Sequence, residues 1–189
     1  MTLASPQDEF SDRGDFAPSQ AFLATHRGQA AFAREYARLV AAIVSDVGAA
    51  ARENPVFAPL IRQSPERCIV QLGPVAMTMV WLRKGAESTA NGELLLILWR
   101  GTIAKSAGEP TEYTSRRREV VAPTILWEEA LHASADSEAT WEWRSGVADA
   151  RGMIALGVSS IELAKRSVRR LAALHDDETA VPVASISLD

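Results

Sequence analysis

The chain has 189 residues, of which 47% are hydrophobic and 23% are charged. This composition predicts one globular domain with a continuous core, and it excludes a disordered chain, which would carry fewer apolar residues. The 20 Lys and Arg residues against 24 Asp and Glu residues give a formal net charge of −4. Because a nucleic-acid backbone attracts basic surfaces, this balance argues against nucleic acid as a partner.

Cysteine content and hydropathy favour a cytoplasmic protein. The single cysteine, Cys68, excludes an internal disulfide framework. Residues 1–10 lack the basic and apolar regions of a secretory signal. The longest uninterrupted apolar run, residues 94–99, is far shorter than the roughly 18 residues of a membrane span. We therefore expect a cytoplasmic location and no membrane contact.

The N-terminal third predicts an arm, a long helix and a connector. Residues 1–18 are mostly polar and are expected to form a flexible arm. Between 19 and 52, apolar residues recur every three or four positions and predict one amphipathic helix, in which Gly28 marks a candidate break or second start. An Asn-Pro pair closes this helix, and residues 56–61 are predicted to form a single helical turn.

The middle of the chain carries the strongest signals for β-strands. Residues 67–83 are rich in strand-forming side chains and are interrupted by Gly-Pro, which predicts two strands or one bulged strand. A polar stretch ending in Asn-Gly separates this run from residues 93–104, so the two are expected to form a hairpin. Residues 112–122 are interpreted as a more exposed strand.

The C-terminal third predicts two further elements and a tail. Residues 124–132 alternate like a strand but contain Glu-Glu-Ala-Leu, which favours a helix by propensity; a strand is preferred. Residues 139–144 predict the last strand. A second long helix is predicted from Ser145 or Gly146 to His175, followed by an acidic tail over 176–189.

These elements define an α+β fold. We expect a single domain over residues 19–175, in which two long terminal helices pack on one face of an antiparallel sheet of four to five strands. The other face, rich in tryptophan, Met77, Met79 or arginine, is then expected to meet a protein partner or a second copy of the chain. A homodimer is the leading expectation.

The motifs of known chemistry are absent. The sequence has no Walker-type loop, no Rossmann glycine triplet, no nucleophile elbow and no paired-histidine zinc helix. The three histidines and Cys68 do not stand at ligand spacing on one element, so no metal site and no cofactor are predicted. Cys68 is interpreted as a core residue, and the alternative is a nucleophile paired with His132.

Carboxylates offer a second route to catalysis. Glu128, Glu129 and Glu142 could act as acid and base if burial shifted one pKa. Neighbours on a strand point to opposite faces, so at most one residue of the Glu128–Glu129 pair can join Glu142.

Arginines and tryptophans supply the remaining candidates. Arg116, Arg117 and Arg118 are interpreted as a solvated strand that protects a sheet edge, and the alternative is a salt-sensitive site for carboxylate, phosphate or an acidic partner. Five tryptophans lie among the predicted strands and are interpreted as core, or alternatively as an aromatic groove. The candidate binding residues are Trp99, Trp127, Trp141, Glu142, Trp143, Arg116, Arg117, Arg118 and His132.

Two functional hypotheses follow. The leading one is a non-catalytic interaction or assembly domain, chaperone-like or regulatory, that acts as a homo-oligomer. The competing one is a small-ligand or enzymatic pocket between sheet and helices, lined by Trp99, Trp127, Trp141 and Trp143, with polarity from Glu142, Arg117 or His132.

Overall fold

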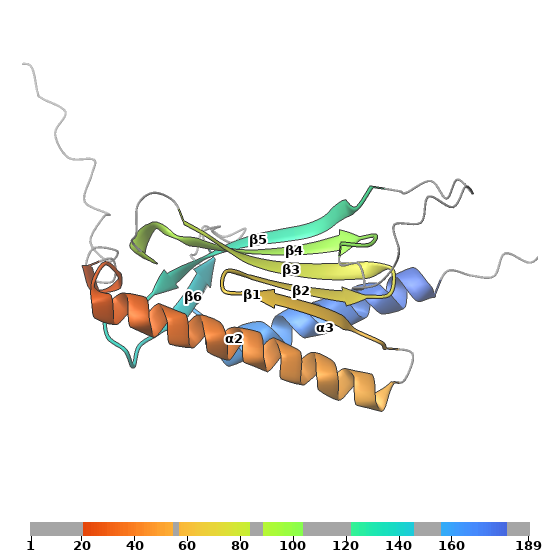
Figure 1. The fold of residues 1–189 in the computed structure, drawn as a ribbon, viewed down its shortest axis with the longest axis horizontal. Helices are drawn as coiled ribbons and strands as arrows, with labels where there is room; N and C mark the ends of the chain where they lie inside the picture. Colours follow the sequence, from red (N-terminus) through yellow and green to blue (C-terminus); the bar gives the residue numbers. More distant parts are fainter. Residues whose placement is uncertain (1–20, 55–56, 84–88, 104–121, 146–155, 181–189) are drawn as a thin grey trace, which may run out of the picture.

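Six strands form one antiparallel sheet that is covered on one face by two helices. The computed structural model describes residues 21–54, 57–83, 89–103, 122–145 and 156–180. The strands span Leu60–Ser64 (β1), Arg67–Leu72 (β2), Val75–Leu82 (β3), Glu93–Arg100 (β4), Thr124–Ser134 (β5) and Glu142–Ser145 (β6). They lie in the order β1-β2-β3-β4-β5-β6, so each strand pairs with its neighbour in sequence (Figure 1).

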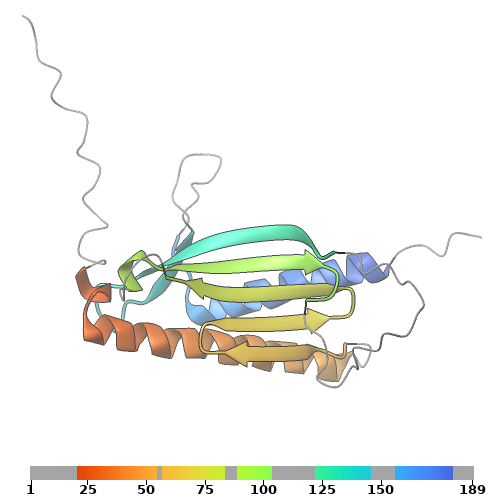
Figure 2. The same cartoon turned by 45° about the horizontal axis from the view of Figure 1, so that its top comes forward.

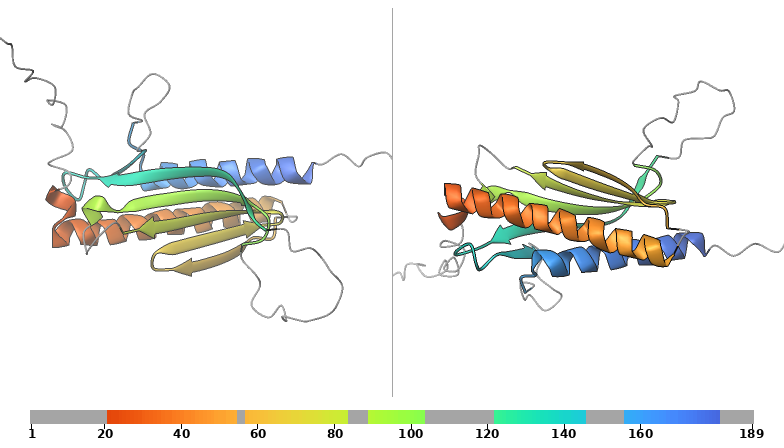
Figure 3. Two further views of the ribbon diagram at one scale, coloured as in Figure 1. Left: turned by 90° about the horizontal axis from the view of Figure 1, so that it is seen from above. Right: turned by 60° about the horizontal axis from the view of Figure 1, so that its bottom comes forward.

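The two helices pack side by side on the same face of this sheet. Helix α2 spans His26–Glu53 and helix α3 spans Ser160–Thr179. Figure 2 shows the strands in front of the helices, and the two views of Figure 3 show the sheet from its helix-free side and from its helix side. The predicted α+β two-layer sandwich is confirmed, with six strands in place of four to five.

The helix predicted over residues 19–52 is interrupted at residues 24 and 25, close to Gly28, and α2 begins at His26. The Thr25 side chain caps the helix by accepting a hydrogen bond from the Gly28 backbone N–H at 3.0 Å. A Cβ atom on Gly28 would lie 2.2 Å from the Phe22 carbonyl oxygen, so only glycine lets the preceding turn fold against the helix. Asn54 ends α2, as predicted.

Strand β1 replaces the helical turn predicted for residues 56–61. Residues 57–59 have no regular structure, and β1 pairs with β2 through register partners such as Ile61 and Val70. The prediction was wrong because Leu60 and Ile61 alone have little intrinsic preference for helix or strand. Hydrogen bonding to β2 decides their conformation. β1 is the sixth strand that the sequence did not predict.

The central hairpins agree with the sequence. Residues 67–83 form β2 and β3, joined at Gly73-Pro74, and β3 pairs with β4 in the expected hairpin. β4 ends at Arg100 and not at residue 104. The strand predicted over 112–122 and the tail after residue 180 lie outside the described residues, as does the arm before residue 21.

Residues 124–132 form a strand, as preferred, although their propensity favours a helix. β5 continues to Ser134 and carries a register irregularity opposite Leu98 and Trp99. Its alternation explains the result: Leu131 is buried under the helices, whereas Glu128 on the other face is exposed. Of the last predicted strand, 139–144, residues 142–144 lie in β6, which ends at Ser145.

Helix α3 begins later than predicted. Residues 156–159 are not helical: the backbone N–H and C=O groups of Val158 exchange hydrogen bonds with Trp143, at 2.9 and 2.8 Å, along the outer edge of β6. The Ser159 side chain then accepts a hydrogen bond from the Glu162 N–H and starts the helix. α3 continues past the expected end at His175 to Thr179.

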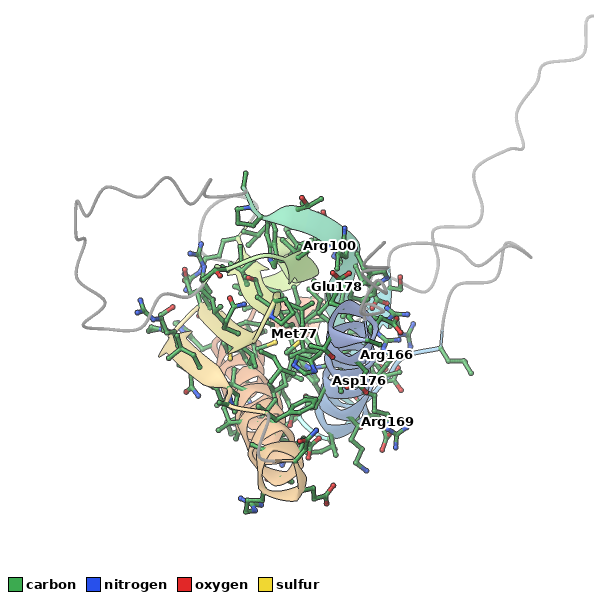
Figure 4. The ribbon with its side chains drawn as sticks, turned by 90° about the vertical axis from the view of Figure 1, so that its right-hand side faces the viewer. Met77, Arg100, Arg166, Arg169, Asp176 and Glu178 are labelled. Carbon is green, nitrogen blue, oxygen red and sulfur yellow. The ribbon has the colours of Figure 1, made fainter. Side chains whose placement is uncertain are left out.

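The core lies between the helices and the sheet. Alternate residues of β3 point to the helices, among them Met77 and Met79, which are 2% and 0% exposed. Figure 4 shows Met77 between the sheet and the helices. The expectation that these methionines lie on the helix-free face was wrong, because the strand phase places them inward. Trp143 is fully buried and its indole Nε1 donates to Ser160 Oγ at 3.0 Å.

Candidate functional site

The sheet face away from the helices, called here the uncovered face, is apolar at its centre. Ile69, Val80, Leu95, Ile97 and Trp99 lie on this side of β2, β3 and β4 by strand alternation. At its margins are two of the most exposed large apolar side chains of the described residues, Leu82 at 39% and Ile125 at 48% exposure. Ile97 is only 9% exposed and the other four are partly buried, so the apolar surface at the centre is limited. Apolar side chains grouped on one face are typical of a surface that binds another molecule.

Charges of opposite sign flank this apolar centre. Arg62 and Arg67 lie on the β1–β2 side of the uncovered face, and both are exposed. Glu93 and Glu128 lie on the β4–β5 side. One side of the face is therefore basic and the opposite side is acidic.

Hydrogen bonds hold the uncovered face in one shape. The Trp99 Nε1 donates to Thr78 Oγ1 at 3.1 Å, which fixes the indole across β3. The buried Gln71 donates through Nε2 to the Val75 and Gly101 carbonyl oxygens, at 3.0 and 3.1 Å, and accepts from the Ile103 N–H at 2.8 Å. A preorganised surface loses little conformational entropy when it binds a partner.

A second feature is a groove between α2 and the turn that joins β1 to β2. Its cavity volume is about 830 Å³. Phe32, Tyr36, Val40 and Val44 form one wall along α2, and Trp81 closes the end. The Phe32 and Trp81 rings are 4.3 Å apart between centroids. Apolar concavities of roughly 300–1,000 Å³ are the usual size of ligand sites.

The groove also contains polar groups. Glu66 and Arg83 form an ion pair of 2.8 Å at its rim, where both side chains are more than half exposed. The Tyr36 hydroxyl is buried and has no hydrogen-bond partner among the described residues. Burial, together with Cys68 and Glu66 nearby, raises the pKa of Tyr36.

Cys68 is a core residue, as interpreted from the sequence. It is 1% exposed, and burial raises the pKa of its thiol to about 11. A thiol with so high a pKa is almost entirely protonated near pH 7 and is a poor nucleophile. Cys68 faces the helices from β2, whereas His132 lies on the other side of the sheet in β5, so the two do not form a catalytic pair.

The structure distributes the candidate tryptophans over both faces of the sheet. Trp141 and Trp143 pack edge to face in the core, 5.6 Å apart. Trp127 lies on the helix side, where the Arg170 guanidinium sits 4.0 Å above its ring centre. Trp99 lies on the uncovered face, so these four side chains do not line one pocket.

The carboxylates are also separated. Glu129 faces α3 and pairs with Arg166 at 2.7 Å, whereas Glu128 lies on the uncovered face, which confirms the predicted split. Glu142 pairs with Arg144 in its own strand at 3.2 Å.

The other polar candidates are His132 and three arginines. The His132 Nε2 lies 3.9 Å from a Glu93 oxygen on the uncovered face. Arg116, Arg117 and Arg118 lie outside the described residues.

In the part of the chain that the structure describes, no group of three or more His, Cys, Asp or Glu side chains is arranged to hold a metal ion. None of the helices described is both long and apolar enough to cross a membrane.

Comparison with known proteins found no match to a family model, to a curated protein or to a solved structure. The function must therefore be argued from the two surface features themselves.

Sequence reasoning did not identify the groove. The usable signal was the width of the apolar stripe on α2. Leu39, Ile43 and Val47 are buried against the core, and a second line of apolar residues, including Phe32 and Val40, runs beside them and is only partly buried. When the apolar stripe of a helix is wider than its contact with the core, part of the stripe remains to bind something else.

Proposed function

We propose that this protein is a non-catalytic interaction domain that assembles with a second copy of itself through the uncovered face. The observation that carries the proposal is the apolar centre of that face, flanked by basic side chains on one side and acidic ones on the other. Apolar side chains on the helix side already provide the core of the domain. A second apolar face is therefore explained by association rather than by folding.

The arrangement of titratable groups supports a role without catalysis. Glu129 and Glu142 are each held by an arginine, and the Cys68 thiol is protonated in the core. A reactive nucleophile needs an activating base or a depressed pKa, and burial raises the pKa of the Cys68 thiol.

The test compares two isoleucines of similar exposure on different surfaces. Ile125 on the uncovered face is 48% exposed, and Ile161 on α3 is 41% exposed. Sedimentation velocity over a range of micromolar concentrations should show a wild-type dimer, a largely monomeric Ile125→Asp variant and a dimeric Ile161→Asp variant. A wild-type protein that remains monomeric throughout this range would contradict the proposal.

A second candidate function is binding of an apolar small molecule in the groove along α2. The cavity of about 830 Å³, with aromatic side chains at one end, favours it. Anilinonaphthalene sulfonate is a suitable probe. Ala37→Trp, which fills the groove, should abolish most of the fluorescence enhancement, whereas Ala30→Trp, at an exposed α2 position outside the groove, should preserve it. Equal enhancement in both variants would remove this candidate.

A further inference from the structure

We propose that the two copies dock face to face about a two-fold axis that runs along β3, so that Arg62 of each copy meets Glu128 of the other. This inference rests on the proposed function, because it specifies how the uncovered face binds its partner. It assigns to both residues an intermolecular role that depends on the order of the strands.

One row of side chains crosses the whole uncovered face. Register partners connect Arg62 to Ile69, Ile69 to Thr78, Thr78 to Ile97, and Ile97 to Glu128. Each of these steps joins directly opposed residues of neighbouring strands, so all five side chains lie on one side of the sheet. The row begins with a positive charge and ends with a negative one; between them lie Ile69, Thr78 and Ile97, of which Thr78 and Ile97 are only 7% and 9% exposed.

A two-fold axis along β3 makes this row complementary to itself. The rotation exchanges β1 with β5 and β2 with β4, because β3 is the middle strand of the five. Arg62 then faces Glu128 of the second copy, and Ile69 faces Ile97 of the second copy. Both charge pairs form at once, Thr78 meets Thr78 of the second copy on the axis, and the two isoleucine pairs lie on either side of it.

One of the two neighbouring rows fits the same axis by size, whereas the other places Arg67 against Leu95 of the second copy. Register partners connect Leu60, Gln71, Ala76, Trp99 and Ile125 across the same five strands. The rotation places the large Trp99 over Gln71 and beside the small Ala76 of the second copy. It also places Leu60 against Ile125, which covers an exposed isoleucine with another apolar side chain.

The dimensions of the face correspond to a small interface. Strands β1 to β5 span about 20 Å at ~4.8 Å per strand, and β3 and β4, with eight residues each, are about 27 Å long at ~3.4 Å per residue. The product of these lengths is roughly 540 Å², below the ~800 Å² that each partner buries in a standard interface. Two sheets packed in this way lie about 10 Å apart, a distance that side chains from both faces fill.

Charge reversal tests the geometry. By sedimentation equilibrium, Arg62→Glu and Glu128→Arg should each raise the dimer Kd at least about tenfold, because each creates two like-charge contacts. The double variant R62E/E128R restores both attractive contacts in the proposed dimer. Its Kd should return to within about threefold of the wild-type value, since electrostatic complementarity is recovered.

A matched reversal on α3 serves as the control. Glu162 and Lys165 form an exposed ion pair away from the sheet, so the variant E162K/K165E should dimerise like the wild type. Thermal unfolding followed by circular dichroism checks that every variant is folded. A wild-type dimer whose Kd is unaffected by the single reversals, or is not restored in the double variant, overturns this geometry and leaves the proposed function standing. A monomeric wild type overturns both.

Discussion

The two faces of β4 differ in how deeply their apolar side chains are buried. On the helix side, Leu94, Leu96 and Leu98 are at most 1% exposed and belong to the main core. On the uncovered face, Leu95 and Trp99 are partly buried and Ile97 is 9% exposed. Both faces are apolar, yet among the described residues helices lie above only one of them. The contrast supports the proposal that folding of this chain uses one face and that the other binds a partner.

The largest expected change in the free energy of unfolding comes from truncating a leucine to alanine on each of the two faces. Leu96→Ala should lower the free energy of unfolding by about 2–5 kcal/mol, because it leaves a cavity in a filled core. Leu95→Ala should cost less than about 1.5 kcal/mol, because the site is partly open. Urea unfolding in the Arg62→Glu background, which we expect to be monomeric, measures both. Equal losses would show that the uncovered face also carries the fold.

The helix layer can be weakened without touching the sheet. Gly28→Ala brings a Cβ atom against the backbone of Phe22 and should cost about 1–3 kcal/mol by overpacking. Gly48 is the control, since its nearest neighbour is the end of the Arg52 side chain at 3.8 Å. Gly48→Ala should stabilise the protein by about 0.5–1 kcal/mol through helix propensity. Thermal unfolding should therefore move in opposite directions for the two variants.

Removing a buried hydroxyl on the helix side should change stability differently depending on whether that hydroxyl has a hydrogen-bond partner. Ser160 Oγ accepts from the Trp143 indole and donates to Glu35 at 2.8 Å, so Ser160→Ala should cost about 1–3 kcal/mol. The Tyr36 hydroxyl has no partner among the described residues, so Tyr36→Phe should leave stability unchanged or raise it by about 1 kcal/mol. Chemical denaturation distinguishes these signs; a clear loss in Tyr36→Phe would mean that the hydroxyl is satisfied.

The smallest effect concerns pH at the exposed end of the helix layer. A hydrogen bond from Arg27, together with the charge of Arg34, lowers the pKa of Glu138. A carboxylate with a lowered folded pKa stabilises the protein above its unfolded pKa, and this contribution is lost as pH falls through the folded pKa. Glu138→Gln should therefore be slightly less stable than wild type at neutral pH and equal to it in strong acid. A difference that does not depend on pH would exclude this ion pair as its cause.

Much of the fold was predictable because period and propensity agreed. The amphipathic stripe around Leu39 and the alternation around Met79 each matched one element. The errors arose where local signals were weak, as in β1, whose conformation depends on pairing with β2. The start of α3 was predictable, because Ser159 followed by Glu162 has the pattern of a capping box.

The candidate site was less predictable from the sequence than the fold. Tryptophan composition alone could not distinguish Trp143, in the core, from Trp99, on the uncovered face. The row from Arg62 to Glu128 links residues on β1 and β5, and it exists only once the strand order and register are known. Its charges are far apart in sequence and give no local motif.

The most direct test mixes two variants. Arg62→Glu and Glu128→Arg each place like charges together in their own homodimers, but a dimer with one chain of each type has opposite charges at both contacts. Sedimentation equilibrium of the equimolar mixture should therefore show dimers with nearly wild-type affinity, although each variant alone is mostly monomeric. A mixture as weakly associated as its components, alongside a dimeric wild type, would contradict assembly through the uncovered face in the proposed geometry.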